Sequence, residues 1–463
     1  MIKKTVFMIM ILVLLITSLG INAGDEVRTI DEYTQLTGSM MELIMGATID
    51  ETIDERVLFE AAMEGMFGAL DPYSDFMTIE ATDEFTNSIE TNYVGVGIQL
   101  NNVEGKNIIE KVFNGSPAEA AGVRAGDVII SVDGVDTESY DIDALLAVLL
   151  GESGTYVDLG VRRSGLDIIY TIGRASITIP TVDTMGLGTI DGIDPALASE
   201  TAYIQINSFG LTTDTLFTEY MNEAITSGAK YLILDLRDNS GGYTSSAIAI
   251  AKALIPAGKV ITFVNADGTE NTDYSTTTNP PFEKIITLIN RNTASSSEIL
   301  ASALQDSGIS VMVGENTYGK GISQMLYQVD PEYYIKITAQ EFFSRNGNKI
   351  HGVGIKPDYE LIVPSYVAGD YRLYMKEDNE DVFKMEAILD YLGYDVGVPD
   401  TYYDELTYKA VYAFQKDAGL FTYGVADYTT QRVLNETLYT TVFNEDRQLN
   451  EALEVLGVSA DTN

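Results

Sequence analysis

The sequence predicts a multidomain α/β protein, in which a β-rich module precedes an α/β core and helical regions lie at both ends. The chain has 463 residues, which is too long for one ordinary domain. Residues 181–364 alternate buried-strand patterns with amphipathic helix patterns, as expected of a largely parallel sheet. Residues 24–91 and 381–438 instead repeat their apolar positions with helical spacing.

Composition excludes several kinds of chemistry before any motif is considered. The chain has no cysteine, so disulfides, thiolate metal sites and cysteine nucleophiles are excluded. Its one histidine, His351, rules out a zinc site of the HExxH type, which needs two. A catalytic triad through histidine would have to use His351, and otherwise a hydrolase built on this sequence would use Lys, Asp or Glu as its base. We expect neither a metal nor a cofactor.

The chain is strongly acidic, with a formal net charge of −41. Nucleic acid is an unfavourable partner, because its binding depends on Lys and Arg releasing counterions from phosphate. Such an acidic surface favours solubility or a salty or alkaline habitat, and it says little about the fold.

The N-terminal segment, residues 1–23, has the pattern of an export signal. Lys3 and Lys4 precede an almost wholly apolar run over residues 6–19, and Ile21-Asn22-Ala23 is compatible with cleavage. The run is short for a spanning helix, although an uncleaved anchor is an alternative. In either case we expect the remainder outside the cytoplasm, secreted or anchored to the outer face of the bacterial cytoplasmic membrane. Residues 24–91 are expected to be helical and without catalytic chemistry, with homodimer formation as an added role.

Residues 92–174 have the pattern of a compact β-rich module. A glycine loop, VGVG, enters an alternating strand over residues 94–100, and the string SPAEAAGVRAGD follows at residues 116–127. This succession resembles a PDZ domain. The resemblance implies that the C-terminus of a peptide binds here and adds a strand to the sheet edge. Its carboxylate would accept hydrogen bonds from the loop formed by Val94, Gly95, Val96, Gly97 and Ile98.

Two polar loops follow buried strands in the α/β region, residues 175–365. The strand pattern KYLILDLR, residues 230–237, is followed by DNSGG, and KIITLIN, residues 284–290, is followed by the serine cluster TASSS. Ligands bind beyond the carboxyl ends of strands in open α/β sheets. We therefore expect the functional site where these two loops meet.

Ser295 in the serine cluster and Lys320 in a Gly-Lys-Gly string are candidates for a nucleophile and its base. A serine hydroxyl needs a base to remove its proton, and a lysine can do so when burial lowers its pKa. The oxyanion would need two donors, the N–H of Ser296 and that of Gly241 or Gly242. An alternative is that Ser295-x-x-Glu forms a capping box at the start of a helix, without chemistry.

Three segments, DLRDNSGG, TASSSEILASALQD and VGENTYGKGISQ, resemble the signature blocks of the carboxy-terminal processing (tail-specific) serine peptidases. The resemblance implies a Ser–Lys endopeptidase in which Ser295 is the nucleophile and Lys320 the base. It further implies that Gln324 orients the lysine, and that Asp306 matches a position implicated in some members. The segment HGVGIKPD, residues 351–358, also fits the family and gives His351 a structural role.

The chain departs from the family pattern at three positions in these blocks. Asp238 and Ser240 replace residues of the common DLRNNPGG form, and Ser296 stands where Ala is usual. The last difference leaves three adjacent serines as competitors for the role of the nucleophile.

Residues 381–440 change in character and are rich in tyrosine. The helical patterns and the segment AVYAFQ resemble a peptidoglycan-binding-like domain, although Pro399-Asp400 stands where Asp-Gly is usual and Ala426-Asp427 where a glycine is common. A small helical interaction module is the alternative. Residues 366–380 are assigned to an acidic linker and residues 441–463 to a tail.

The sequence as a whole is that expected of an exported Ser–Lys endopeptidase that cleaves protein substrates near their C-termini. The PDZ domain would capture the substrate tail and gate the site, and peptidoglycan is a further candidate partner. The alternative from another class is a catalytically inactive cell-wall scaffold that binds peptide C-termini and peptidoglycan.

Overall fold

The structure is a computed structural model of the chain. It describes residues 28–458 apart from 51, 91, 104–105, 114, 164, 179, 191–192 and 369–370. The segment expected to be a signal or anchor therefore lies outside the described residues. The chain divides into two compact units, residues 1–76 and 77–463, which are described separately. No helix in the described part is both long and apolar enough to cross a membrane.

The first unit consists mainly of helices α2 (Ile30–Ala47) and α3 (Glu55–Phe67). Thr29 begins α2 with a capping box, because its hydroxyl accepts the Glu32 N–H while the Glu32 carboxylate accepts the Thr29 N–H. Strand β1 (Asp75–Thr78) crosses the division between the units. These helices agree with the helical region expected from the sequence.

Helix α4 (Ile79–Ile89) begins the second unit and leads into the β-rich module. Five strands pair in the order β3-β4-β5-β7-β8, with β6 beside β5, and β2 pairs with β9. The module has its own buried core, to which Ile109, Leu145 and Leu159 contribute fully buried side chains. Its elements are β2 (Asn92–Gly95), β3 (Ile98–Val103), β4 (Lys106–Val112), α5 (Pro117–Ala121), β5 (Val128–Val132), β6 (Val135–Asp136), α6 (Ile142–Leu149), β7 (Tyr156–Arg163), β8 (Leu166–Gly173) and β9 (Ala175–Thr178).

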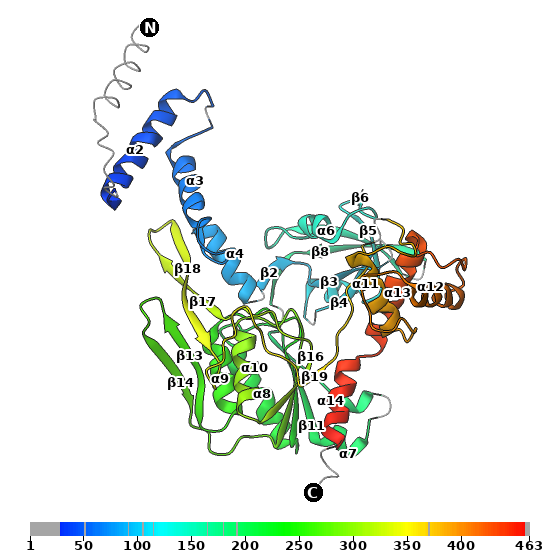
Figure 1. Cartoon of the computed structure of the whole chain (residues 1–463). Helices are drawn as coiled ribbons and strands as arrows, with labels where there is room; N and C mark the ends of the chain where they lie inside the picture. The colour runs from blue at the N-terminus through cyan, green and yellow to red at the C-terminus, as the bar shows by residue number, and fades with distance from the viewer. Residues whose placement is uncertain are drawn as a thin grey trace. The chain divides into compact units, whose positions relative to one another are not determined.

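The α/β core is built on a six-stranded sheet with the order β10-β11-β12-β15-β16-β19. Strands β11, β16 and β19 of this sheet are labelled in Figure 1. All neighbouring strands are parallel except β10 and β11, so the predicted largely parallel sheet is confirmed. The strands are β10 (Val182–Met185), β11 (Thr201–Ile206), β12 (Tyr231–Asp235), β15 (Lys284–Ile289), β16 (Ser310–Gly314) and β19 (Tyr359–Glu360).

Successive residues along a strand face opposite apolar layers. Because both faces of the strands are buried, their sequences are almost continuously hydrophobic. Leu232 and Leu234 pack with helices α8 (Thr213–Thr226), α9 (Thr244–Leu254) and α10 (Ser296–Asp306). Ile233, between them, faces the opposite layer, which contains η1 (Leu187–Thr189), α7 (Pro195–Glu200) and α14 (Arg447–Val458). The sheet is therefore covered on both faces.

A second, antiparallel sheet belongs to the same core and was not anticipated from the sequence. It contains β13 (Gly258–Asn265), β14 (Glu270–Ser275), β17 (Ile322–Gln328) and β18 (Tyr333–Phe343). Phe342 of β18 is fully buried in the apolar layer beside α9 and α10, so this sheet extends the same core.

The C-terminal domain consists of helices α11 (Glu380–Tyr391), α12 (Glu405–Asp417) and α13 (Tyr428–Asn444). Its core also takes in Val367 and Leu373, from the segment assigned to an acidic linker. The residues assigned to a tail complete α13 and then form α14, which packs on the six-stranded sheet.

Candidate active site

Ser295 lies at a sharp turn between β15 and α10. Its backbone has φ +57° and ψ −117°, a conformation that residues other than glycine rarely adopt and that is typical of strained functional positions. Its side chain is partly exposed. The expected capping box between Ser295 and Glu298 is present, and its bond from the Ser295 N–H to the Glu298 carboxylate measures 2.8 Å.

The two serines that follow differ from Ser295 in burial and in bonding. Ser296 and Ser297 are both fully buried. The Ser296 hydroxyl donates to the Gly242 carbonyl at 2.8 Å, and the Ser297 hydroxyl donates to the Asn239 carbonyl at 2.9 Å. Both hydroxyls therefore fasten the DNSGG loop to α10, and Ser295 is the best placed of the three to meet a substrate.

Glu298 joins the serine segment to the lysine segment. One carboxylate oxygen accepts the backbone N–H of both Ser295 and Lys320, each at 2.8 Å. The other oxygen accepts the Gly319 N–H at 2.8 Å and the Thr317 hydroxyl at 2.6 Å. Complete burial raises the pKa of Glu298, and these four hydrogen bonds, which favour the carboxylate, oppose that rise. The sequence identified Glu298 only as a helix-capping residue.

The loop that carries Lys320 packs closely on the segment at residues 351–354. A Cβ atom on Gly321 would lie 2.2 Å from the backbone nitrogen of His351, so only glycine fits there. The Gly352 N–H donates to the Gly319 carbonyl at 2.8 Å, which gives the HGVG string a structural role. Gln324 lies on β17, and its side-chain amide donates to the Thr338 hydroxyl on β18 at 3.1 Å.

The DNSGG loop also contacts the turn that carries Ser295. The Asn239 carbonyl accepts the Ala294 N–H at 3.0 Å, and a Cβ atom on Gly241 would lie only 2.9 Å from the Ser295 Cβ. The Gly241 N–H, however, donates to the Asn239 side chain at 2.9 Å. This bond occupies one amide expected as an oxyanion donor, which leaves those of Ser296 and Gly242 as candidates.

Asp238 and Asp306 have structural partners in this arrangement. The Asp238 carboxylate accepts the side-chain amides of Asn290 and Asn292, each at 2.8 Å, and so links the two polar loops. Asp306 ends α10, about 16 Å along the helix from Ser295. Its carboxylate accepts the Ser344 hydroxyl at 2.5 Å and thereby holds the turn after β18.

The loop expected to bind a peptide carboxylate is held by neighbouring elements of the β-rich module. Val94 and Gly95 pair with β9. The Val96 carbonyl accepts the Ala118 N–H at 2.9 Å. Gly97 has φ +87°, and a Cβ atom there would lie 2.2 Å from the Ser116 Cβ, so glycine is required. Among the described residues there is no cluster of acidic or histidine side chains that could hold a metal ion.

Three family profiles match successive parts of the chain. Peptidase family S41 matches residues 200–361, a PDZ domain matches residues 108–163, and a putative peptidoglycan binding domain matches residues 378–434. The order of these three domains is the order expected from the sequence.

Curated relatives match nearly the whole chain. The carboxy-terminal processing protease CtpB of Bacillus subtilis is 31% identical over 421 residues, covering 88% of this chain and 86% of that protein. CtpA of the same organism is 31% identical, covering 87% and 86%. A probable CtpA-like serine protease of Staphylococcus epidermidis is 28% identical, covering 86% and 81%. The chain therefore belongs to the carboxy-terminal processing serine peptidases of family S41.

Proposed function

We propose that this peptidase is an exported endopeptidase with a Ser295–Lys320 catalytic pair, and that it cleaves proteins near their C-termini. The observation that carries the pairing is the single Glu298 oxygen bonded to the backbones of both residues. It supports a site in which the two side chains start from neighbouring backbone positions. A partly exposed serine on strained backbone and a half-buried lysine are suited to acyl transfer.

In the proposed reaction, neutral Lys320 accepts the proton of the Ser295 hydroxyl as its oxygen attacks the substrate carbonyl. The resulting oxyanion accepts hydrogen bonds from the Ser296 and Gly242 amides. Lys320 then donates the proton to the leaving amine, and it activates the water that hydrolyses the acyl-enzyme. The position of Ser295 at the start of α10 favours developing negative charge on its oxygen, and Gln324 orients the lysine.

The PDZ domain is proposed to bind the substrate tail and to gate the site. The terminal carboxylate of the tail accepts N–H groups of residues 94–98, while the peptide adds a strand beside β3. The helical domain at residues 378–434 would hold the enzyme at peptidoglycan, in agreement with a location outside the cytoplasm.

The test is cleavage of an unfolded protein with an apolar C-terminal tail, with products identified by mass spectrometry. Ser295→Ala and Lys320→Ala should each reduce turnover by at least about 1,000-fold, because neither half of the pair acts alone. The matched control is Ser227→Ala, at the end of α8, which removes the serine of a Ser-x-x-Lys string at residues 227–230 that lies outside the candidate site. Unchanged turnover in either site variant would reject the assignment.

A further inference from the structure

Helix α14 lies beyond the residues matched by the three family profiles, yet it covers one face of the catalytic sheet. Its apolar side is buried against strand residues that include Ile233, Ile286 and Val313. At its far end, the Lys284 ammonium group donates to the Val455 carbonyl at 3.0 Å. The helical domain is thus inserted between two elements of the core, β19 before it and α14 after it.

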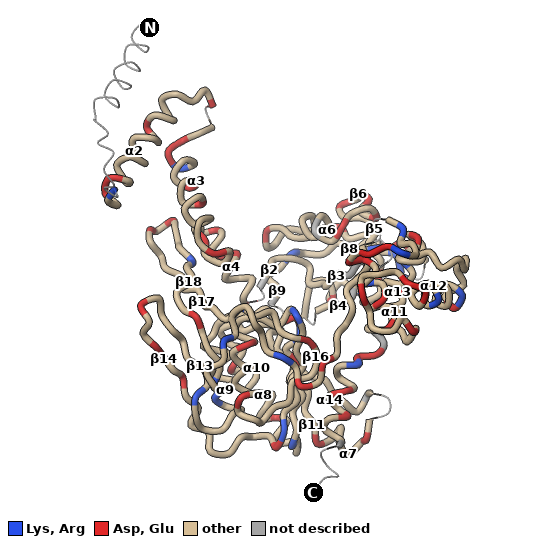
Figure 2. The backbone as a smooth tube through the Cα atoms, viewed as in Figure 1, with Lys and Arg blue, Asp and Glu red and all other residues tan. Residues whose placement is uncertain are grey.

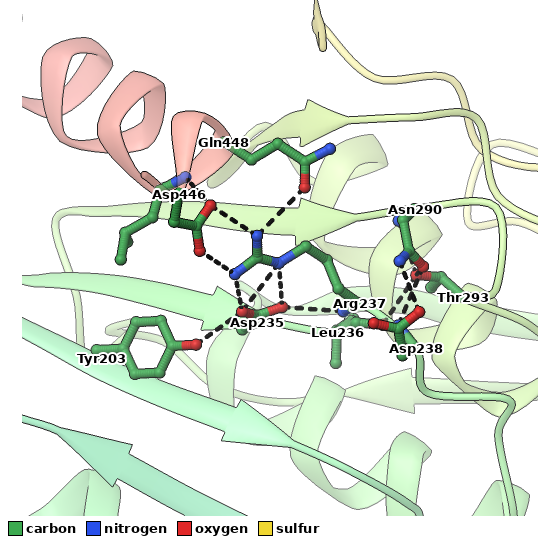
Figure 3. A network of polar contacts seen from close by, with 10 residues as sticks. Tyr203, Asp235, Leu236, Arg237, Asp238, Asn290, Thr293, Asp446 and Gln448 are labelled. Carbon is green, nitrogen blue, oxygen red and sulfur yellow. Dashed lines mark hydrogen bonds and ion pairs between the residues drawn. The ribbon is translucent and has the colours of Figure 1, made fainter. Parts of the chain in front are cut away.

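The first turn of α14 is fastened to the core by Arg237 of the DLRDNSGG block (Figure 3). The two terminal nitrogens of Arg237 donate to the two carboxylate oxygens of Asp446, at 2.8 and 2.7 Å. The same guanidinium donates to buried Asp235 through Nε at 3.0 Å and Nη2 at 2.5 Å. Gln448 accepts a weaker bond at 3.3 Å, and Tyr203 donates to Asp235 at 2.7 Å.

Arg237 also lies within the backbone that supports the nucleophile. The carbonyl of the preceding residue, Leu236, accepts the Thr293 hydroxyl at 2.8 Å, and Leu236 N–H donates to Leu288 at 3.0 Å. Two residues beyond Arg237, the Asn239 carbonyl accepts the Ala294 N–H at 3.0 Å. The residues on either side of Arg237 therefore contact the turn that ends at Ser295.

The ion pair can fix the direction of this loop because its geometry is specific. A guanidinium bonded to a carboxylate through two parallel N–H groups is held in orientation as well as position. Asp446, directly before α14, itself accepts the Leu449 N–H at 3.0 Å. Leu449 lies in the first turn of α14, whose apolar side is buried. Arg237 therefore has a rigid support on each side, Asp235 in the sheet and Asp446 at α14.

We propose that Asp446 is a positioning residue of the peptidase, acting through Arg237 on the loop at residues 236–242 and hence on Ser295 and the Gly242 amide. This inference rests on the proposed function for its kinetic readout. A residue 151 positions after the nucleophile, directly before a helix outside the peptidase profile, would then help to keep the catalytic groups in place.

The experiment compares Asp446→Asn with Lys284→Met in the full chain. Both changes weaken the attachment of α14, but only the first touches Arg237. We expect Asp446→Asn to lower kcat by about 10- to 100-fold with KM nearly unchanged, because small displacements of reacting groups cost that much. Lys284→Met should keep kcat within about twofold of the wild type. Hydrogen exchange should accelerate in segments 236–243 and 293–296 of Asp446→Asn alone.

Equal losses of kcat in the two variants would overturn the proposal, since they would reflect α14 attachment only. Unchanged exchange in segment 236–243 of Asp446→Asn would also overturn it, whether or not the enzyme is active. If Asp446→Asn does not fold, the experiment uses Arg237→Lys instead, with the same expectations. Lysine keeps the positive charge but cannot donate two parallel hydrogen bonds to Asp446. A wild-type chain that cleaves no tail, or a Ser295→Ala chain that does, counts instead against the proposed function.

Discussion

Glu298 shows how much of the site depends on one buried carboxylate. Its two oxygens accept four hydrogen bonds, two on each oxygen, from the segments that carry Ser295 and Lys320. Glu298→Gln would turn an NH₂ group toward two of these donors, whichever way the amide is placed. We expect activity to fall by about 100-fold and the free energy of unfolding by about 2–5 kcal/mol, from two unsatisfied buried donors.

Turnover and urea unfolding measured on the same preparation check this prediction. Glu386→Gln is the matched control, because Glu386 is also a buried acid that accepts bonds from Thr407 and from the Asp400 N–H, but it lies in the C-terminal domain. It should lose stability and keep its kcat. Full activity in Glu298→Gln would contradict the role of Glu298 in joining the two segments.

Gly241 lies so close to Ser295 that a larger residue there would crowd the serine. Gly241→Ala would place a Cβ 2.9 Å from the Ser295 Cβ, on backbone with φ +111°. Gly228→Ala has comparable strain, with φ +98°, but its Cβ would meet no atom within 4 Å. Both variants should therefore lose about 1–3 kcal/mol of stability, and only Gly241→Ala should also lose most of its kcat. Equal kcat values for the two variants would show that crowding at Ser295 does not matter.

At the scale of single residues, the sequence offered candidates for the reactive groups but not for the residues that hold those candidates in place. Ser295 and Lys320 are recognisable because few other residues could serve in a chain with one histidine and no cysteine. Asn239, which binds the Gly241 N–H and the Ile206 carbonyl, carries no comparable signal. Asparagine is common in loops, and its partners are distant in sequence.

At the scale of elements, the two polar loops lie where the strand pattern placed them, at the carboxyl ends of β12 and β15. That prediction succeeded because parallel neighbours share the direction of their ends. Helix α14 was missed, because a short amphipathic pattern near the C-terminus does not reveal which surface it covers. Its partner strands lie more than 130 residues earlier in the chain.

The attachment of α14 should depend on acid pH through Asp446. Partial burial favours the neutral acid, but the hydrogen bonds and charge of Arg237 outweigh burial and lower the pKa of Asp446. A lowered folded-state pKa contributes stability above the unfolded value, about 3.9, and this contribution is lost as the pH falls through the folded value. The stability difference between wild type and Asp446→Asn should thus be constant above about pH 5 and shrink toward pH 3.

Urea unfolding of both chains between pH 3 and pH 7 measures that difference. The comparison cancels the many other carboxylates, which titrate in both proteins. A difference that grows as the pH falls would contradict the assigned direction of the shift.

At the scale of the whole molecule, acidic side chains outnumber basic ones, with 69 Asp and Glu against 28 Lys and Arg. Figure 2 shows acidic positions recurring along the helices and loops, with basic positions fewer between them. Repulsion among these charges opposes folding, and salt reduces its range from about 30 Å at 0.01 M to about 8 Å at 0.15 M. We expect the Tm to rise by several degrees over this interval.

Thermal unfolding followed by circular dichroism in NaCl and in KCl checks the effect of salt. The two salts should give the same Tm at equal ionic strength, because screening depends on charge and concentration rather than on ion identity. A Tm that falls with added salt would mean that attractive ion pairs, such as Arg237 with Asp446, outweigh the net repulsion.

The sequence by itself determined the order of the domains and the parallel sheet, and it predicted the Ser295–Lys320 pair, because these depend on local periodicity and on residue chemistry. Only the tertiary structure decided that Ser296 and Ser297 are buried, that Glu298 joins the serine and lysine loops, and that the C-terminal helix returns to the core. The physical reason is that each of these features is a contact between segments distant in sequence. A residue's type limits its partners, but packing selects which partner it meets.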